Sequence, residues 1–185
     1  MKDIIKNALI ITLVAIIGSG VLGWVYSFTA PEIQKQKERS LREGIKTIFS
    51  NEESFEELKD FGGKELSGGI KVLNVYKVKN KNGSEGYVFH ALFPGYGGKI
   101  ESLIGYKDDV CSGIIILEHA ETPGLGAKIT TEEFRKQFVN KSLSDPFIPK
   151  KDVVAITGAT VSSRSVSTAI KKIAEFYREE VKGGK

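Results

Sequence analysis

The stretch at residues 70–118 reads IKVLNVYKVKNKNGSEGYVFHALFPGYGGKIESLIGYKDDVCSGIIILE. Apolar, β-branched and aromatic residues dominate four runs within it, and glycine, asparagine, aspartate and proline gather between the runs. Short apolar runs separated by such turn residues are typical of strands joined by tight turns. The stretch therefore predicts an antiparallel meander with strands at Ile70–Val78, Gly86–Phe93, Lys99–Tyr106 and Val110–Glu118.

Two helices and one further strand are predicted after the meander. Thr131–Val139 is a short helix that Thr130 or Thr131 can cap. A last short strand is expected at Val153–Ile156. The segment Ser162–Val181 is a longer helix with one buried stripe, because its apolar side chains recur at helical spacing; the stripe consists of Val166, Ile170, Ile173 and Tyr177. The chain is therefore expected to have an α+β fold, with an antiparallel sheet and helices packed against one face.

The segments before the meander differ in character. Residues 1–30 are predicted to form an N-terminal transmembrane anchor. Residues 31–69 are predicted to form a juxtamembrane helix, amphipathic towards Phe49, and then a loop with at most one short turn of helix after residue 51. The globular domain is expected to occupy residues 70–185.

The composition excludes several kinds of site. The 185 residues carry a net charge of +4, with basic residues scattered along the chain, so nucleic acid is not indicated as a partner. A single cysteine, Cys111, excludes an intramolecular disulfide and any zinc or iron–sulfur site built from several cysteines. The two histidines, His90 and His119, leave little material for a metal centre. Redox chemistry would therefore need an organic cofactor.

The apolar N-terminal segment is long enough to cross a membrane. Residues 8–25 read ALIITLVAIIGSGVLGWV, and about 20 residues of helix span the hydrocarbon core. Trp24 and Tyr26 stand at its far end, where aromatic rings favour the membrane interface. A cleaved signal peptide is the competing interpretation. The nearest candidate for a small-x-small cleavage site is Ser27-Phe28-Thr29-Ala30, which is not a convincing one, so an uncleaved anchor is favoured. The flanking charges do not decide the orientation, because long domains translocate regardless of them.

One motif has residues that could bind a phosphate group. The predicted strand at residues 153–156 ends in Thr157-Gly158-Ala159-Thr160, and a helix begins at once. Small residues allow a ligand to approach the backbone, and the free N–H groups of a helix start favour a phosphate. Hydroxyl residues before a helix are also ordinary N-caps, so both interpretations stand on the residues alone. The motif is not a Walker A loop, because no GxxxxGK[ST] pattern is present.

The sequence Asp152-x4-Thr157-Gly158-Ala159-Thr160 resembles the flavinylation motif of FMN-binding domains. Residues 95–100, GYGGKI, are similar to the family's G-Y-x-G-x-I turn, although a proline often stands in place of Lys99. Residues 119–126, HAETPGLG, are similar to its H-x-E-T-P-G-L-G segment. With its anchor and length, the chain resembles the G subunit of Rnf ferredoxin:NAD oxidoreductase complexes, a family related to the C subunit of the sodium-pumping NADH:quinone reductase.

The resemblance implies that Thr160 carries FMN covalently through its phosphate, placed there by a separate flavin transferase. The chain would then be an electron-transfer subunit with no catalytic or metal site of its own. It would lie in the cell membrane beside the other Rnf subunits, with its soluble domain on the extracytoplasmic side. The other expected cofactor-binding residues are Thr157, Gly158, Ala159, Ser163, Glu121, Thr122, Gly124, Leu125 and Tyr96.

Several alternatives stay open. A membrane-tethered sensor that binds flavin without transferring electrons would show the same motifs. Tyr96 can stack near the flavin or anchor its turn. Asp152 can help bring the transferase or its magnesium to the site, or it can be an exposed residue before a strand. His119 and Cys111 are better explained as structural residues than as reactive ones.

Overall fold

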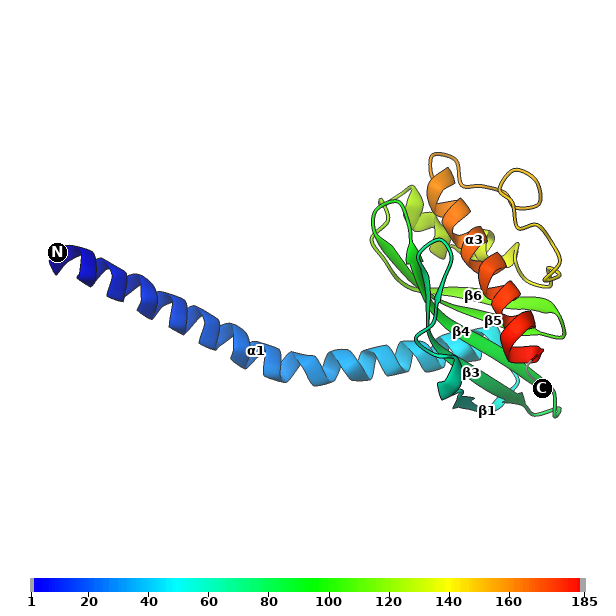
Figure 1. The fold of residues 1–185 in the computed structure, drawn as a ribbon, viewed down its shortest axis with the longest axis horizontal. Coiled ribbons are helices and arrows are strands. Elements are labelled where there is room, and N and C mark those ends of the chain that lie inside the picture. The colour runs from blue at the N-terminus through cyan, green and yellow to red at the C-terminus, as the bar shows by residue number, and fades with distance from the viewer. Residues whose placement is uncertain (1, 184–185) are drawn as a thin grey trace. The chain divides into compact units, whose positions relative to one another are not determined.

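The computed structural model describes residues 2–183. The chain forms two compact units, one up to residue 40 and the other from residue 41 onward. The first unit belongs to a single long helix, α1 (Lys2–Ile48), whose last turns belong to the second unit. The second unit contains the sheet and the remaining helices (Figure 1).

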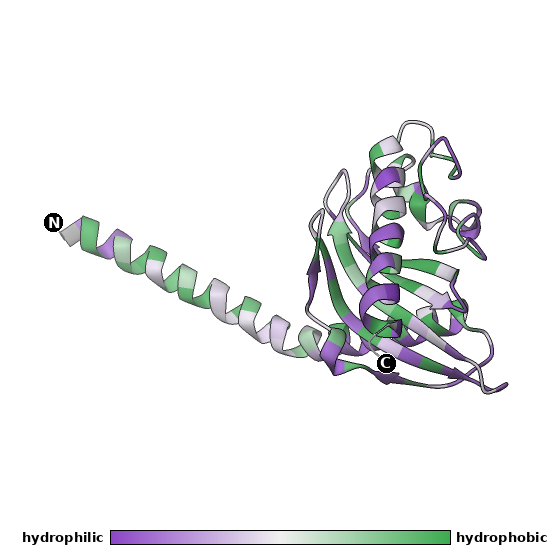
Figure 2. Ribbon diagram, turned by 45° about the vertical axis from the view of Figure 1, so that its right-hand side comes forward, coloured by the Kyte–Doolittle hydropathy of each residue, from purple (hydrophilic) through white to green (hydrophobic). Residues whose placement is uncertain are grey.

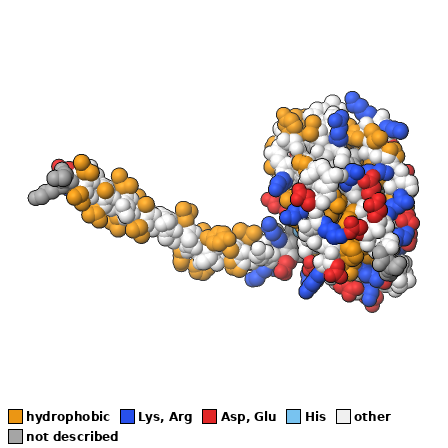
Figure 3. Space-filling model, in the orientation of Figure 1, with side chains coloured by type: hydrophobic (Ala, Val, Ile, Leu, Met, Phe, Trp, Pro, Cys, Tyr) orange, Lys and Arg blue, Asp and Glu red, His pale blue; other side chains and the backbone are white. Residues whose placement is uncertain are grey.

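The helix α1 contains the predicted membrane segment. An 18-residue window of this helix has a mean hydropathy of 2.3. Among the described residues, α1 is the one helix that is long and apolar enough to cross a membrane. The ribbon of its N-terminal part is coloured mostly as hydrophobic in Figure 2, and Figure 3 shows hydrophobic side chains along its surface with almost no charge among them. The juxtamembrane helix predicted after residue 31 is a continuation of α1, since Pro31 lies inside the helix.

The sheet confirms the predicted meander. Strands β3 (Ile70–Asn80), β4 (Glu85–Pro94), β5 (Lys99–Lys107) and β6 (Val110–His119) pair as antiparallel neighbours in chain order. The strand order is β1-β3-β4-β5-β6, so β1 (Glu52–Glu57) adds an edge beside β3. The two-residue strand β2 (Glu65–Leu66) also pairs with β3.

Both faces of the sheet are covered. Helix α3 (Thr160–Phe176) lies across one face (Figure 1), where its apolar stripe joins the main core. The buried Tyr106 hydroxyl donates a hydrogen bond of 2.6 Å to the Ile170 carbonyl, which fixes α3 on β5. The end of α1 covers the other face, where Ile45 and Phe49 pack against Leu103 and strand residues around it. Such burial of apolar area is the main force that holds the layers together.

The remaining elements are short. They are η1 (Lys59–Phe61), η2 (Gly126–Thr130), α2 (Glu132–Lys136) and a π-helical extension of α3, η3 (Tyr177–Lys182). The predicted cap of the short helix is Thr131, whose hydroxyl accepts a hydrogen bond from the Phe134 N–H group. The α+β fold class is confirmed.

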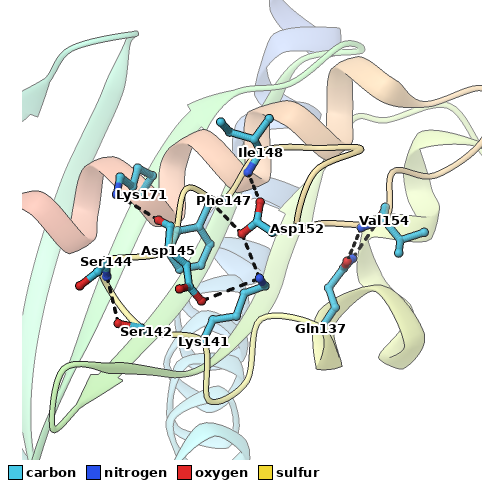
Figure 4. Close-up of polar contacts among 10 residues, drawn as sticks. All are labelled: Gln137, Lys141, Ser142, Ser144, Asp145, Phe147, Ile148, Asp152, Val154 and Lys171. Atoms are coloured by element: carbon cyan, nitrogen blue, oxygen red, sulfur yellow. Dashed lines mark hydrogen bonds and ion pairs between the residues drawn. The ribbon is translucent and has the colours of Figure 1, made fainter.

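Two local predictions were wrong. The segment after residue 51 contains strand β1, which the sequence hides because EESFEE is acidic and only Phe55 offers an apolar side chain to the sheet. The strand predicted at Val153–Ile156 does not form: Val153 makes an isolated bridge with Pro149, and the segment joins no sheet. The side chain of Gln137 takes the place of a neighbouring strand there, since its amide pairs with both the N–H and the carbonyl of Val154 (Figure 4).

Candidate functional site

The turn between β4 and β5 packs closely against the segment after β6. It closes with a 2.7 Å hydrogen bond from the Gly95 N–H group to the Gly98 carbonyl. A Cβ atom on Gly97 would lie 2.1 Å from the Ala120 carbonyl oxygen, and one on Gly95 would lie 2.0 Å from a carboxylate oxygen of Glu121. The glycines therefore allow residues 95–98 to contact the segment that follows β6, and Tyr96 is left 72% exposed at the tip.

Glu121 connects this turn to helix α3. Its carboxylate is buried, with 5% of the residue exposed. One oxygen accepts hydrogen bonds from the N–H groups of Tyr96 at 2.7 Å and Gly97 at 3.3 Å. The other accepts a 2.6 Å bond from the Ser162 hydroxyl. Hydrogen bonds to an ionised group are the strong ones, so Glu121 braces three separate segments against one another.

The loop after Glu121 is compact. The N–H groups of Leu125 and Ala127 both donate to the Thr122 carbonyl, at 3.2 and 3.1 Å. Gly124 has a φ of +75°, a conformation that favours glycine. These bonds present the side chain of Leu125, which is 44% exposed, beside the start of α3.

The Thr157–Thr160 turn positions the expected attachment residue. Gly158 has a φ of +79°, and α3 begins at Thr160. Its N-cap residue, Ala159, offers no side-chain hydrogen bond. No side chain at the N-cap therefore accepts a hydrogen bond from the first N–H groups of the helix. The Thr160 hydroxyl also has no hydrogen-bond partner within residues 2–183.

These three segments enclose a hollow of about 480 Å³, which we call the Thr160 hollow. It has the size of an ordinary small-molecule site, for which about 300–1,000 Å³ is typical. It brings together seven of the predicted cofactor-binding residues: Tyr96, Glu121, Thr122, Leu125, Gly158, Ala159 and Thr160. Its lining is completed by Gly126, Val161 and Ser162, which are not among the expected cofactor-binding residues.

Three predicted residues do not line the Thr160 hollow. Gly124 shapes the loop, with open space around its Cα. Ser163 is fully buried, and its hydroxyl accepts from the Ile156 N–H group and donates to the Ala159 carbonyl, both at 3.0 Å. Ser163 thus supports the turn from behind. Thr157 lies on the other side of the turn, where it lines a second hollow.

The second hollow has a volume of about 650 Å³ and shares Gly158 and Thr160 with the first. We call it the lysine hollow, because Lys150 and Lys151 line it. The rest of its lining is Asp152, Val153, Val154, Ala155, Ile156 and Thr157. Thr160 therefore stands between two open spaces of different character.

Asp152 holds the loop that carries these lysines (Figure 4). Its carboxylate accepts hydrogen bonds from the N–H groups of Ile148 at 2.6 Å and Phe147 at 3.1 Å, and it pairs with Lys141 at 2.9 Å. Burial raises the pKa of Asp152, but the Lys141 bond and the backbone donors together outweigh that effect and hold the pKa below its ordinary value. Asp152 is therefore a structural carboxylate of the loop, rather than a freely exposed residue before a strand.

His119 and Cys111, two residues with reactive side chains near the sheet, have structural roles. The His119 ring accepts a 3.2 Å hydrogen bond from the Glu121 N–H group. Cys111 is buried within β6, and burial raises the pKa of its thiol to about 12. Among residues 2–183, no group of three or more histidine, cysteine or acidic side chains could hold a metal ion.

Comparisons with known proteins agree with this architecture. The model of the FMN-binding domain family matches residues 95–175, which include all three segments around the Thr160 hollow, and the model of the RnfG N-terminal region matches residues 1–48. The fold and the site thus define a protein with an FMN-binding domain behind an N-terminal apolar helix.

Relatives that match over most of their length indicate the particular family. The chain is 31% identical to the G subunit of an ion-translocating oxidoreductase complex from Methanosarcina acetivorans, over 95% of each chain. It is 28% identical to the G subunit of a proton-translocating ferredoxin:NAD(+) oxidoreductase complex from Clostridium ljungdahlii, over 89% of this chain and 86% of that one. The chain belongs to the G-subunit family of ion-translocating oxidoreductase complexes, which confirms the resemblance indicated by the motifs.

Among solved structures, the chain is similar to the C subunit of the Na⁺-translocating NADH-quinone reductase of Parabacteroides distasonis. The two share 21% sequence identity, with a TM-score of 0.47, over 57% of this chain and 61% of that one.

Proposed function

We propose that the chain is the electron-transfer subunit of a membrane-bound Rnf ferredoxin:NAD oxidoreductase complex and carries FMN bound covalently through a phosphoester to Thr160. The observation that carries this proposal is the position of Thr160. Its hydroxyl, which has no hydrogen-bond partner within residues 2–183, stands at the first residue of α3, on the wall of the Thr160 hollow. The assignment to an Rnf complex and to FMN as the cofactor is supported by the similarity to G subunits and to the FMN-binding domain family.

The residues around the hollow fit a flavin nucleotide. The uncapped N–H groups at the start of α3 are suited to phosphate oxygens, and the helix dipole favours their negative charge. Leu125 and Val161 offer exposed apolar surface to a planar ring, and the exposed ring of Tyr96 can stack on it. Thr122 lines the same hollow and supplies a hydroxyl for the polar edge of the ring.

The chain's own contribution is to hold and orient the cofactor. FMN supplies the chemistry of accepting and releasing electrons, one or two at a time. Thr160 would provide the oxygen of the phosphoester bond. Glu121 and Ser163 would act as positioning residues, since each is bonded within the protein and holds a segment of the wall in place. Thr157 stays a candidate phosphate contact from the lysine hollow.

The proposed setting is the cell membrane. The apolar part of α1 would cross it once and keep the domain at its surface. The soluble domain would face the extracytoplasmic side, and the partners would be the other Rnf subunits, the surrounding lipid and a flavin transferase for maturation.

The test is the intact mass of the full chain, purified in detergent after expression with and without a flavin transferase. We expect a mass increase of one FMN less water, mapped by peptide digestion to residues 157–160 and absent from Thr160→Ala. Thr168→Ala is the matched control, because it removes the same side chain from an exposed position of the same helix. An unmodified wild-type mass in the presence of active transferase would refute the covalent attachment.

A further inference from the structure

Thr160 lies between two hollows that differ in charge. Among the described residues, Glu121 is the one charged side chain that lines the Thr160 hollow, and both of its oxygens already accept hydrogen bonds from the protein. No cationic side chain lines this hollow within the described chain. A phosphate ester next to Thr160 carries negative charge at neutral pH, so its counter-charge has to come from elsewhere.

The lysine hollow contains that counter-charge. Lys150 and Lys151 both line it, together with Thr160. Neither ammonium group has an acidic partner within residues 2–183. The nearest carboxylate in the sequence, Asp152, is bonded to Lys141 and to two backbone N–H groups. Within residues 2–183, the two lysine charges are therefore not neutralised by any acidic side chain.

The backbone that carries the lysines is firmly held. The Lys150 N–H group donates to the Val153 carbonyl at 2.8 Å, and the Lys151 N–H group donates to the Ile148 carbonyl at 3.0 Å. Lys150 has a φ of +69°, which is unfavourable for a residue with a Cβ atom. A local arrangement of this kind persists only where surrounding bonds fix it, and the carboxylate of Asp152 provides them. The loop thus holds both lysines at the lining of the hollow that Thr160 shares.

We propose that the lysine hollow is an anion subsite in which Lys150 and Lys151 bind the phosphate that adjoins the ribityl chain of a flavin nucleotide. The flavin ring then occupies the Thr160 hollow, and the phosphate lies at Thr160, where the two hollows meet. This inference rests on the proposed function and adds to it the residues that select a phosphorylated flavin. The same two charges also neutralise the phosphoester once it is attached.

The experiment measures equilibrium binding of riboflavin, FMN and FAD to the full chain in detergent, purified without a transferase and followed by flavin fluorescence. The ratio of the riboflavin Kd to the FMN Kd reports the phosphate contact. We expect this ratio to fall about tenfold, equivalent to about 1.4 kcal/mol, in the Lys150→Gln, Lys151→Gln double variant, because both charge contacts with the phosphate are lost. The riboflavin Kd should stay at the wild-type value.

The matched control is the Lys79→Gln, Lys81→Gln double variant. It makes the same change in net charge on exposed residues of the β3–β4 hairpin, which lines neither hollow. We expect its Kd ratio to equal that of the wild type. The ratio of the FMN Kd to the FAD Kd should be the same in all three proteins, since the proposal assigns the lysines to the inner phosphate.

Four results would overturn the proposal. The first is an unchanged riboflavin-to-FMN ratio in the Lys150→Gln, Lys151→Gln variant. The second is a parallel loss of riboflavin and FMN binding, which would make the lysines structural. The third is a change confined to the FMN-to-FAD ratio, which would assign them to the outer phosphate. The fourth is equal binding of FMN and riboflavin by the wild type, or no detectable binding of FMN. Either result refutes the inference alone, because the proposed function is tested separately by the mass of the chain expressed with the transferase.

Discussion

Replacing Glu121 should destabilise the whole wall of the Thr160 hollow. The carboxylate accepts two short hydrogen bonds, of 2.7 Å from the Tyr96 N–H group and 2.6 Å from the Ser162 hydroxyl, and a longer one of 3.3 Å from Gly97. A hydrogen bond to a charged group contributes roughly 1.5–3 kcal/mol. Counting the two short bonds, Glu121→Ala should lower the free energy of unfolding by about 4 kcal/mol.

The variant Glu121→Gln separates the effect of the carboxylate charge on stability from the effect of the side-chain volume. Glu121→Gln keeps the side-chain volume and one carbonyl oxygen, but its bonds are no longer charge-assisted, so we expect a loss of about 2 kcal/mol. Ser162→Ala removes a single bond and should cost about 1–2 kcal/mol. In a double-mutant cycle, Glu121→Ala and Ser162→Ala should couple by about 1–2 kcal/mol, because they share that bond.

The assay is chemical unfolding of the full chain in detergent, followed by near-ultraviolet circular dichroism of the packed tyrosines. Tyr106 and Tyr177 report on the core directly, since their rings stack with centroids 5.6 Å apart. A loss below about 1 kcal/mol for Glu121→Ala would show that the carboxylate is not a brace, because removal of even one charged bond should exceed that value. Zero coupling to Ser162 would refute the specific contact.

Two other predictions test the surroundings of the site. Asp152→Asn should cost about 1 kcal/mol of stability at pH 7, a modest value because the Lys141 pair is partly solvated. Since the pKa of Asp152 is lowered in the folded protein, its contribution is present above the unfolded pKa of about 4 and is lost as the pH falls through the folded value. The stabilities of Asp152→Asn and wild type, measured by unfolding at several pH values, should therefore converge in acid, while a gap that persisted there would contradict the assignment. Gly126→Ala would place its Cβ atom 2.4 Å from a Glu121 oxygen and 2.9 Å from the Ser162 hydroxyl, so it should cost about 1–3 kcal/mol and reduce flavin loading. Gly124→Ala, in the same loop, meets no atom within 4 Å and should cost only the backbone strain of its positive φ, roughly 1–2 kcal/mol, with loading preserved; equal loading of the two variants would show that the contact at Gly126 is unimportant.

The sequence by itself determined the elements whose signal is local. Alternating apolar residues and turn residues predicted four strands of the sheet, because one face or both faces of each strand must be buried. The uncharged segment at residues 8–25 predicted a helix able to cross a membrane, since its length and composition alone decide that property. The motifs at residues 95–100, 119–126 and 157–160 identified the family, which the comparisons confirm.

The tertiary structure alone decided which residues meet. Glu121 and Ser162 are 41 residues apart, and no periodicity in the chain indicates their bond. Strand β1 forms only because the edge of β3 offers it partners. Val153–Ile156 stays outside the sheet, where the Gln137 amide bonds to both backbone groups of Val154 and the Ser163 hydroxyl accepts from the Ile156 N–H group.

The positions of Thr157 and Ser163, on either side of Thr160 in the sequence, were likewise decided only by the tertiary structure. Thr157 and Ser163 lie so close to the attachment residue in the sequence that both are natural candidates for contact with the phosphate. The positive φ of Gly158 turns the chain there, and the first turn of α3 directs Ser163 inward. Contacts between segments distant in sequence depend on how the layers pack, and that packing is a property of the whole core rather than of any local pattern.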